Sequence, residues 1–188
     1  GDISGRKADN LKTPIGTLQN SDLKTDNYAA SIGYILKNGY LGGVYREFSS
    51  DYGIPGVFIG AHPKGVDITM IKKQIKFKAE YNLNNDLIKN LEVNFIRDKY
   101  NHKEFEASGL IGAEFGLINY SGDITVNHNK FGFLDNGTWG ISSDYRDFNI
   151  GGYVFTSPTK SIKLSAFFYE NISFNDNKTS IEFSGRIN

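Results

Sequence analysis

Lys72-Lys73-Gln74-Ile75-Lys76-Phe77-Lys78-Ala79-Glu80-Tyr81 is a stretch in which polar and apolar side chains alternate. From Gln74 on, every even position is polar and every odd position is apolar. A period of two residues predicts a β-strand with one wet face and one apolar face. Because the alternation recurs along the chain in stretches too long for a small soluble sandwich, it predicts a wall between lipid and water.

The composition narrows the class of protein. The chain has 188 residues, of which 39% are hydrophobic and 14% aromatic, and its mean hydropathy is -0.39. It lacks a run of about 18 apolar residues, which excludes a transmembrane helix but not a transmembrane β-barrel. The 21 basic and 21 acidic residues balance, which argues against nucleic acid as a partner. The absence of cysteine rules out disulfides and thiolate sites.

The sequence predicts an all-β fold with nine antiparallel up-and-down strands, and it contains almost no helix signal. The expected strands are Asp2–Lys12, Lys24–Lys37, Tyr40–Tyr52, Val66–Tyr81, Leu91–Ala107, Glu114–His128, Thr138–Ile150, Ser161–Phe174 and Thr179–Asn188.

The connections alternate in kind. Compact turns are expected at Asn38-Gly39, Asn84-Asn85-Asp86, Asp135-Asn136-Gly137 and Asn175-Asp176-Asn177. Longer connections are expected at 13–20, 53–65 and 151–159. Short turns at one end and long loops at the other are typical of outer-membrane barrels, with the turns periplasmic and the loops outside. The short connection at 107–112 does not fit this alternation.

Most strands divide cleanly into two faces. Ile75, Phe77, Ala79 and Tyr81 are expected to meet lipid, whereas Lys76, Lys78 and Glu80 are expected to face the lumen. Lys73 falls on the apolar face, where a long side chain could reach the membrane interface. Lys72, Lys76 and Lys78 are interpreted as a solvated lumen face rather than as a clamp for substrate.

Three stretches resemble one family. They are Leu11–Ser21; Tyr40-Leu41-Gly42-Gly43-Val44-Tyr45 with Asp51-Tyr52-Gly53-Ile54-Pro55-Gly56; and Arg97–Glu104. In order and spacing they resemble the barrel of TonB-dependent outer-membrane receptors, in the branch that takes up metals or iron complexes. The resemblance covers nearly the whole chain. It implies a Gram-negative outer-membrane location, surrounding lipid, and a metal ion or metal chelate as cargo.

The chain also departs from that family. A full receptor has an N-terminal plug, a segment that contacts TonB and about 22 strands. We find no plug and no TonB box here, and an odd number of strands cannot close an ordinary single-chain bacterial barrel. We therefore expect residues 1–188 to be an internal part of a receptor barrel. The rest of the barrel would be a partner, and TonB would act only through the missing plug.

The candidate metal ligands are His62, His102 and Glu104. His62 follows the Gly-Ile-Pro-Gly element, with Asp51 and Asp67 near it in sequence, and imidazole with carboxylates suits Zn²⁺ or another borderline cation. His102 shares a strand face with Glu104 and Glu106 at a spacing of two residues. The alternatives are an ordinary loop histidine at His62 and a solvated strand end at His102. His128, beside a turn, is given no specific role.

No pattern predicts catalysis or a resident cofactor. The chain has no cysteine, no Gly-x-Ser-x-Gly elbow and no phosphate-binding Gly-x-x-x-x-Gly-Lys-Ser/Thr loop. Two functions stay open: a segment of an active transporter or receptor, and a self-contained β-barrel or β-sheet domain that binds or adheres. They differ in whether the first and last strands pair or are open edges.

Overall fold

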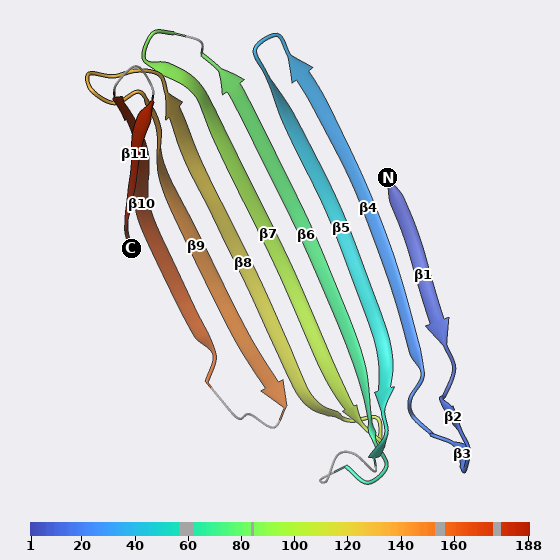
Figure 1. Ribbon diagram of the computed structural model, residues 1–188. Helices are drawn as coiled ribbons and strands as arrows, with labels where there is room; N and C mark the ends of the chain where they lie inside the picture. Colours follow the sequence, from blue (N-terminus) through green and yellow to red (C-terminus); the bar gives the residue numbers. More distant parts are fainter. Residues whose placement is uncertain (57–61, 84, 153–156, 175–177) are drawn as a thin grey trace.

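The computed structural model describes residues 1–188 except 57–61, 84, 153–156 and 175–177 (Figure 1). Nine strands form one sheet in the order β1-β4-β5-β6-β7-β8-β9-β10-β11, and two short strands form a separate ribbon. The strands are β1 (Asp2–Ala8), β2 (Lys12–Thr13), β3 (Gly16–Thr17), β4 (Leu23–Leu36), β5 (Gly39–Ile54), β6 (Val66–Asn82), β7 (Ile88–Glu106), β8 (Ile111–His128), β9 (Asn136–Gly152), β10 (Thr159–Phe174) and β11 (Thr179–Ile187).

Every strand of the large sheet pairs antiparallel with its neighbour in the chain order, which confirms the predicted up-and-down arrangement. The sheet is not closed: β1 and β11 are its outer strands and lie far apart (Figure 1). Among the described residues, no helix is long and apolar enough to cross a membrane.

Several boundaries differ from the prediction. The turn predicted at Asn38-Gly39 is Lys37-Asn38 instead, because Gly39 pairs with Leu36. The first strand ends at Ala8 rather than at Lys12, because Lys12 pairs with Thr17 in the β2–β3 ribbon. The turn predicted at Asp135-Asn136-Gly137 is wrong, because β9 begins at Asn136, which pairs with Asn171 of β10. The connection between β8 and β9 is residues 129–135 instead. The turn predicted at Asn175-Asp176-Asn177 lies outside the described residues.

The sheet has two dissimilar ends. At the turn end, the connections are 37–38, 83–87, 129–135 and 175–178; at the loop end, they are 9–22, 55–65, 107–110 and 153–158. Short connections dominate the turn end, as predicted, although the connection 129–135 is longer than expected. The short connection 107–110 lies at the loop end, as the sequence indicated.

Apolar side chains form a continuous band across one face. Phe77 is the register partner of Phe95, and Ile124 is the partner of Ile141, so these side chains share a face. We call the following residues the apolar band: Ile32, Tyr34, Leu41, Ile75, Phe77, Tyr81, Val93, Phe95, Ile124, Ile141, Leu164 and Phe168. On β6 it runs from Ile75 to Tyr81, about 20 Å at the usual rise of a strand.

The band ends toward the loop end in a row of charges. The register aligns Glu47 with Lys73, Lys73 with Lys99, and Asp147 with Lys160. We call Glu47, Lys73, Lys99, Asp147 and Lys160 the charged row. Lys73, which broke the alternation in the sequence, therefore marks the edge of the band, with its Nζ 3.3 Å from Glu47.

The sheet is a single layer. In the described part of the chain, the buried hydrophobic residues are Val66, Ile68 and Ala113, all near the loop end. Most of the apolar band is exposed; Ile32 is 80% exposed and Ile141 is 59% exposed. Domains that are stable in water bury such a face against a second layer of structure. Among the described residues, no second layer covers the apolar band.

Asp135 fastens the connection 129–135 to β10. Its carboxylate accepts a hydrogen bond from the backbone N–H of Ser173 and lies 3.4 Å from Lys130 Nζ. Its own N–H donates to the carbonyl of Asn171 at 2.9 Å. The hydrogen bonds from Ser173 and the nearby Lys130 ammonium lower the pKa of the Asp135 carboxyl.

We predict that Asp135 stabilises the fold only where it is ionised. Because its folded pKa is lowered, the contribution is complete above the ordinary carboxyl pKa of about 3.9 and is lost as pH falls through the lower folded value. Thermal unfolding of Asp135→Asn should show a deficit in unfolding temperature relative to wild type at pH 6 that shrinks in acid. Asp86→Asn, in another turn, is the control. A deficit that does not change with pH would contradict this assignment.

Candidate functional site at the loop end

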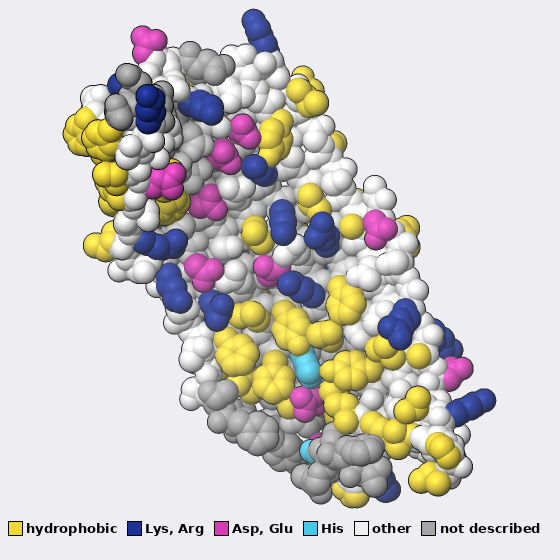
Figure 2. Space-filling model, in the orientation of Figure 1, with side chains coloured by type: hydrophobic (Ala, Val, Ile, Leu, Met, Phe, Trp, Pro, Cys, Tyr) yellow, Lys and Arg dark blue, Asp and Glu magenta, His cyan; other side chains and the backbone are white. Residues whose placement is uncertain are grey.

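The polar face becomes apolar near the loop end. Its centre carries ion pairs between strands, such as Lys72 Nζ with Asp98 at 3.8 Å and Lys78 Nζ with Glu92 at 3.7 Å. Toward the loops, two register rows place apolar and aromatic side chains together, and Figure 2 shows them gathered around a histidine. We call these residues the loop-end patch: Phe48, Met70, Tyr100, His102, Phe115, Leu117, Phe148 and Ile150.

His102 lies within the loop-end patch. Its Nδ1 is 3.0 Å from the Tyr100 hydroxyl, and its ring meets Phe115 edge-on at a centroid distance of 5.6 Å. Its Nε2 is 3.2 Å from Glu104 Oε1, as expected for side chains two residues apart on one strand face. That nitrogen is nevertheless buried without a hydrogen bond. A buried nitrogen in this state has capacity for a further partner.

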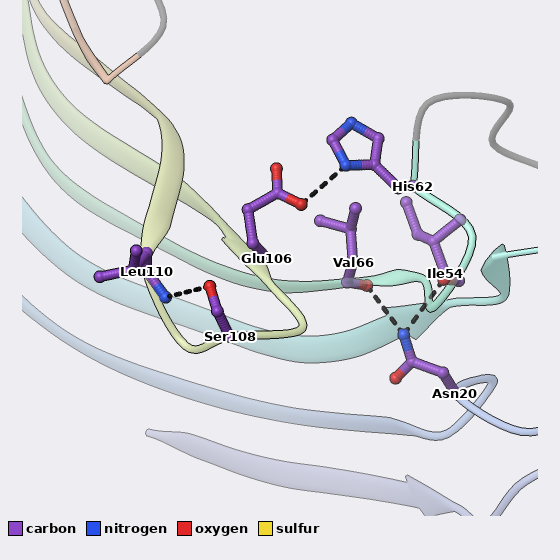
Figure 3. A network of polar contacts seen from close by, with 7 residues as sticks. All are labelled: Asn20, Ile54, His62, Val66, Glu106, Ser108 and Leu110. Atoms are coloured by element: carbon purple, nitrogen blue, oxygen red, sulfur yellow. Dashed lines mark hydrogen bonds and ion pairs between the residues drawn. The ribbon is translucent and has the colours of Figure 1, made fainter.

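His62 is held by a carboxylate of a neighbouring strand. Its Nδ1 lies 2.8 Å from Glu106 Oε2, which joins the connection 55–65 to the end of β7 (Figure 3). Glu106 is the register partner of Val66 and shares the polar face with Glu104 and His102. The His62–Glu106 pair therefore lies beyond the loop-end patch, toward the loops.

Asn20 holds the same connection from the other side. Its Nδ2 donates to the carbonyls of Ile54 and Val66, at 3.1 Å each, where β5 ends and β6 begins (Figure 3). Asn20 has a φ of 58°, a left-handed conformation that asparagine tolerates better than most residues. The side chain of Asn20 thus holds the residues at both ends of the connection, Ile54 and Val66.

The structure sorts the predicted metal ligands into two pairs. His102 and Glu104 come together as expected, but His62 meets Glu106 rather than Asp51 or Asp67. Strand alternation explains this, because Asp51 and Asp67 are in register with residues of the opposite face. Among the described residues, no group of three or more His, Cys, Asp or Glu side chains could hold a metal ion. The metal site of His62, His102 and Glu104 stays a prediction.

A second polar cluster, at the turn end, was missed in the sequence. His128 is 2% exposed, and its Nε2 lies 3.0 Å from Glu170 Oε2, although β9 runs between their two strands. Glu170 also accepts a hydrogen bond from Trp139 Nε1, and the Trp139 ring lies 4.7 Å from the His128 ring. The residue between them is Gly137, in register with both. The sequence signal for this cluster was Gly137, a glycine within a strand that lies between His128 and Glu170.

Gly137 makes the contact between His128 and Glu170 possible. A Cβ at position 137 would collide with the Glu170 carboxylate, and it would lie 2.5 Å from the carbonyl oxygen of Tyr169 and 2.6 Å from His128 Nε2. We predict that Gly137→Ala separates this buried pair and lowers the free energy of unfolding by about 1–3 kcal/mol, the cost of unpaired buried polar groups. Urea or thermal unfolding in detergent measures the loss.

Gly116→Ala is the matched control for that substitution. Gly116 also lies in a strand of the sheet, but its added Cβ would come no closer than 3.9 Å to another atom. It should therefore be neutral or slightly stabilising. Equal stability of the two variants would mean that the His128–Glu170 contact contributes little.

Comparison with known proteins adds no further assignment. No known protein family and no curated protein matches this sequence. The features that indicate a function are therefore the sheet, its two faces and the side chains at its ends.

Proposed function

We propose that this chain forms part of the wall of a β-barrel in a bacterial outer membrane, and that the barrel takes up a metal ion or a metal chelate. The chain would supply strands of the cylinder and part of the outer mouth. The energy for uptake would come through a plug and TonB, as in the receptors that the sequence resembles.

The apolar band of the single-layer sheet carries this proposal. Outer-membrane barrels present a lipid-facing apolar band about 25 Å tall, close to the about 20 Å spanned on β6. The charged row ends the band where the polar interface of a bilayer would begin. Lipid is an apolar phase that covers such a face without a second layer of protein.

Strand length and the open edges also support a barrel wall. β7 has 19 residues and β6 has 17, whereas about 9–11 residues cross a membrane. The strands would therefore extend beyond the bilayer, and in the proposed barrel the loop-end patch would lie at the outer mouth. Unpaired backbone groups cannot face lipid, so the outer edges of β1 and β11 require further strands. We propose that these belong to the remainder of the barrel.

The loop end offers a place for cargo. The pairs His62–Glu106 and His102–Glu104 supply imidazole nitrogens and carboxylate oxygens, which bind borderline cations such as Zn²⁺. The loop-end patch would contact the organic part of a chelate. Ligation needs neutral imidazole, so capture of a bare metal should weaken in acid.

Spin labels test which face meets lipid. Phe77 and Lys78 are adjacent on β6 and belong to opposite faces. With the whole barrel that contains this chain reconstituted in lipid vesicles, a nitroxide at position 77 should be accessible to oxygen, which concentrates in lipid. A nitroxide at position 78 should be accessible to a water-soluble nickel complex. Equal access at both sites, or the reverse, would contradict the barrel wall and favour a binding or adhesion domain in water.

A metal-affinity measurement tests the cargo. If the loop end captures a bare metal, His62→Ala and Glu106→Gln should each weaken Zn²⁺ binding at least about tenfold, as measured by competition with a coloured chelator. Asp67→Asn, which removes a carboxylate of the opposite face, is the control. Unchanged affinity in both loop-end variants would exclude His62 as a ligand and leave a chelate as the cargo.

A further inference from the structure

Two lysines of the charged row face each other directly. Lys73 on β6 and Lys99 on β7 are register partners, and both are exposed. Like charges placed opposite each other on adjacent strands destabilise a sheet. Lys73 has Glu47 on its other side at 3.3 Å, but within the described residues no carboxylate lies within ion-pair distance of Lys99. This arrangement lacks an anion between the two strands.

Arg97 adds a third cation on the same face. It is in register with Ile75 and Tyr120, one row inside the apolar band. Its Nε donates to the Tyr120 hydroxyl at 3.2 Å, and its guanidinium lies 5.7 Å from the centre of that ring. Across the charged row and Arg97, four cations, including Lys160, stand against the two carboxylates of Glu47 and Asp147. The edge of the band is therefore net positive.

We propose that Lys73, Lys99 and Arg97 bind the phosphate of an anionic lipid headgroup at the loop-end boundary of the apolar band. This inference rests on the proposed membrane location of the sheet. Arginine and lysine are the residues that pair with phosphate oxygens, the former through a planar fork and the latter as a point charge. A phosphate over Lys73 and Lys99 would neutralise their mutual repulsion.

The position favours lipid over a soluble anion. The cations lie on an open face, at the edge of a band where acyl chains would pack, so a headgroup there would be continuous with chains on Phe77 and Phe95. Tyr45, Tyr120 and Tyr145 share one register row beside the cations. Amphipathic aromatic rings concentrate at the level of the headgroups. A soluble anion would make no contact with the neighbouring apolar surface.

Vesicle flotation tests the lipid. The whole barrel that contains this chain is mixed with vesicles of phosphatidylcholine alone, or of phosphatidylcholine containing phosphatidylglycerol, at fixed ionic strength. Wild type should associate with both and prefer the anionic vesicles. Each lysine near an anionic surface contributes about 1 kcal/mol, or about fivefold, so Lys73→Gln with Lys99→Gln should lower the preference by about fivefold per charge removed.

A matched control removes equal charge from the other face. Lys76 and Lys163 lie in one register row of the polar face, so Lys76→Gln with Lys163→Gln should retain the preference. A second measurement excludes a merely structural role. In detergent without anionic lipid, the Lys73→Gln, Lys99→Gln variant should unfold at the same temperature as wild type or higher, because the repulsion that it loses offsets the loss of the exposed ion pair between Lys73 and Glu47.

The outcomes separate this inference from the proposed function. No association with either vesicle would contradict the membrane location itself. Association with no preference for phosphatidylglycerol, or an equal loss in the control variant, would overturn the lipid site alone. Millimolar inorganic phosphate that abolishes the preference, where chloride of the same ionic strength does not, would indicate a site for a soluble anion. A lower unfolding temperature in the variant would assign the lysines to the fold.

Discussion

A single layer of β-sheet has no second layer against which to bury its apolar face. Here that constraint governs the whole chain: the hydrogen bonds between strands hold nine strands together, but burial of side chains contributes little except near Val66 and Ile68. A soluble domain gains most of its stability from removing apolar surface from water. If the sheet lies in a membrane, as we propose, lipid would cover the apolar band in place of a second layer.

Both ends of the sheet use polar contacts where a core is absent. At the loop end, Asn20 and Glu106 hold one connection from two sides. At the turn end, Asp135 holds another to β10. These contacts join segments distant in sequence, and each satisfies a backbone or charged group that apolar packing could not. Ion pairs between neighbouring strands likewise join the middle of the polar face.

The period of two residues predicted the long strands and which side chains share a face, because each side chain's face follows directly from its position. The short connections predicted the order of these strands, whereas the β2–β3 ribbon was not predicted. The register was not predictable, and it decides which charges meet: Lys73 with Lys99, and His62 with Glu106 instead of Asp51. The turn at Asp135 was misplaced because Asn136 and Gly137 are typical turn residues. Here Gly137 serves the contact between His128 and Glu170, a long-range requirement that local turn preferences do not register.

The crossing of His128 and Glu170 above Gly137 has a consequence for how the sheet can assemble. Sliding β9 by two residues would keep its side chains on the same faces but would bring Asp135 or Trp139 between His128 and Glu170, and either side chain would force the two partners apart. Slippage is the usual error of long strands with repeating pattern, since many offsets keep apolar residues on one side. The register of β8, β9 and β10 is thus favoured by one contact, and that contact is complete only when β10 has paired with β9.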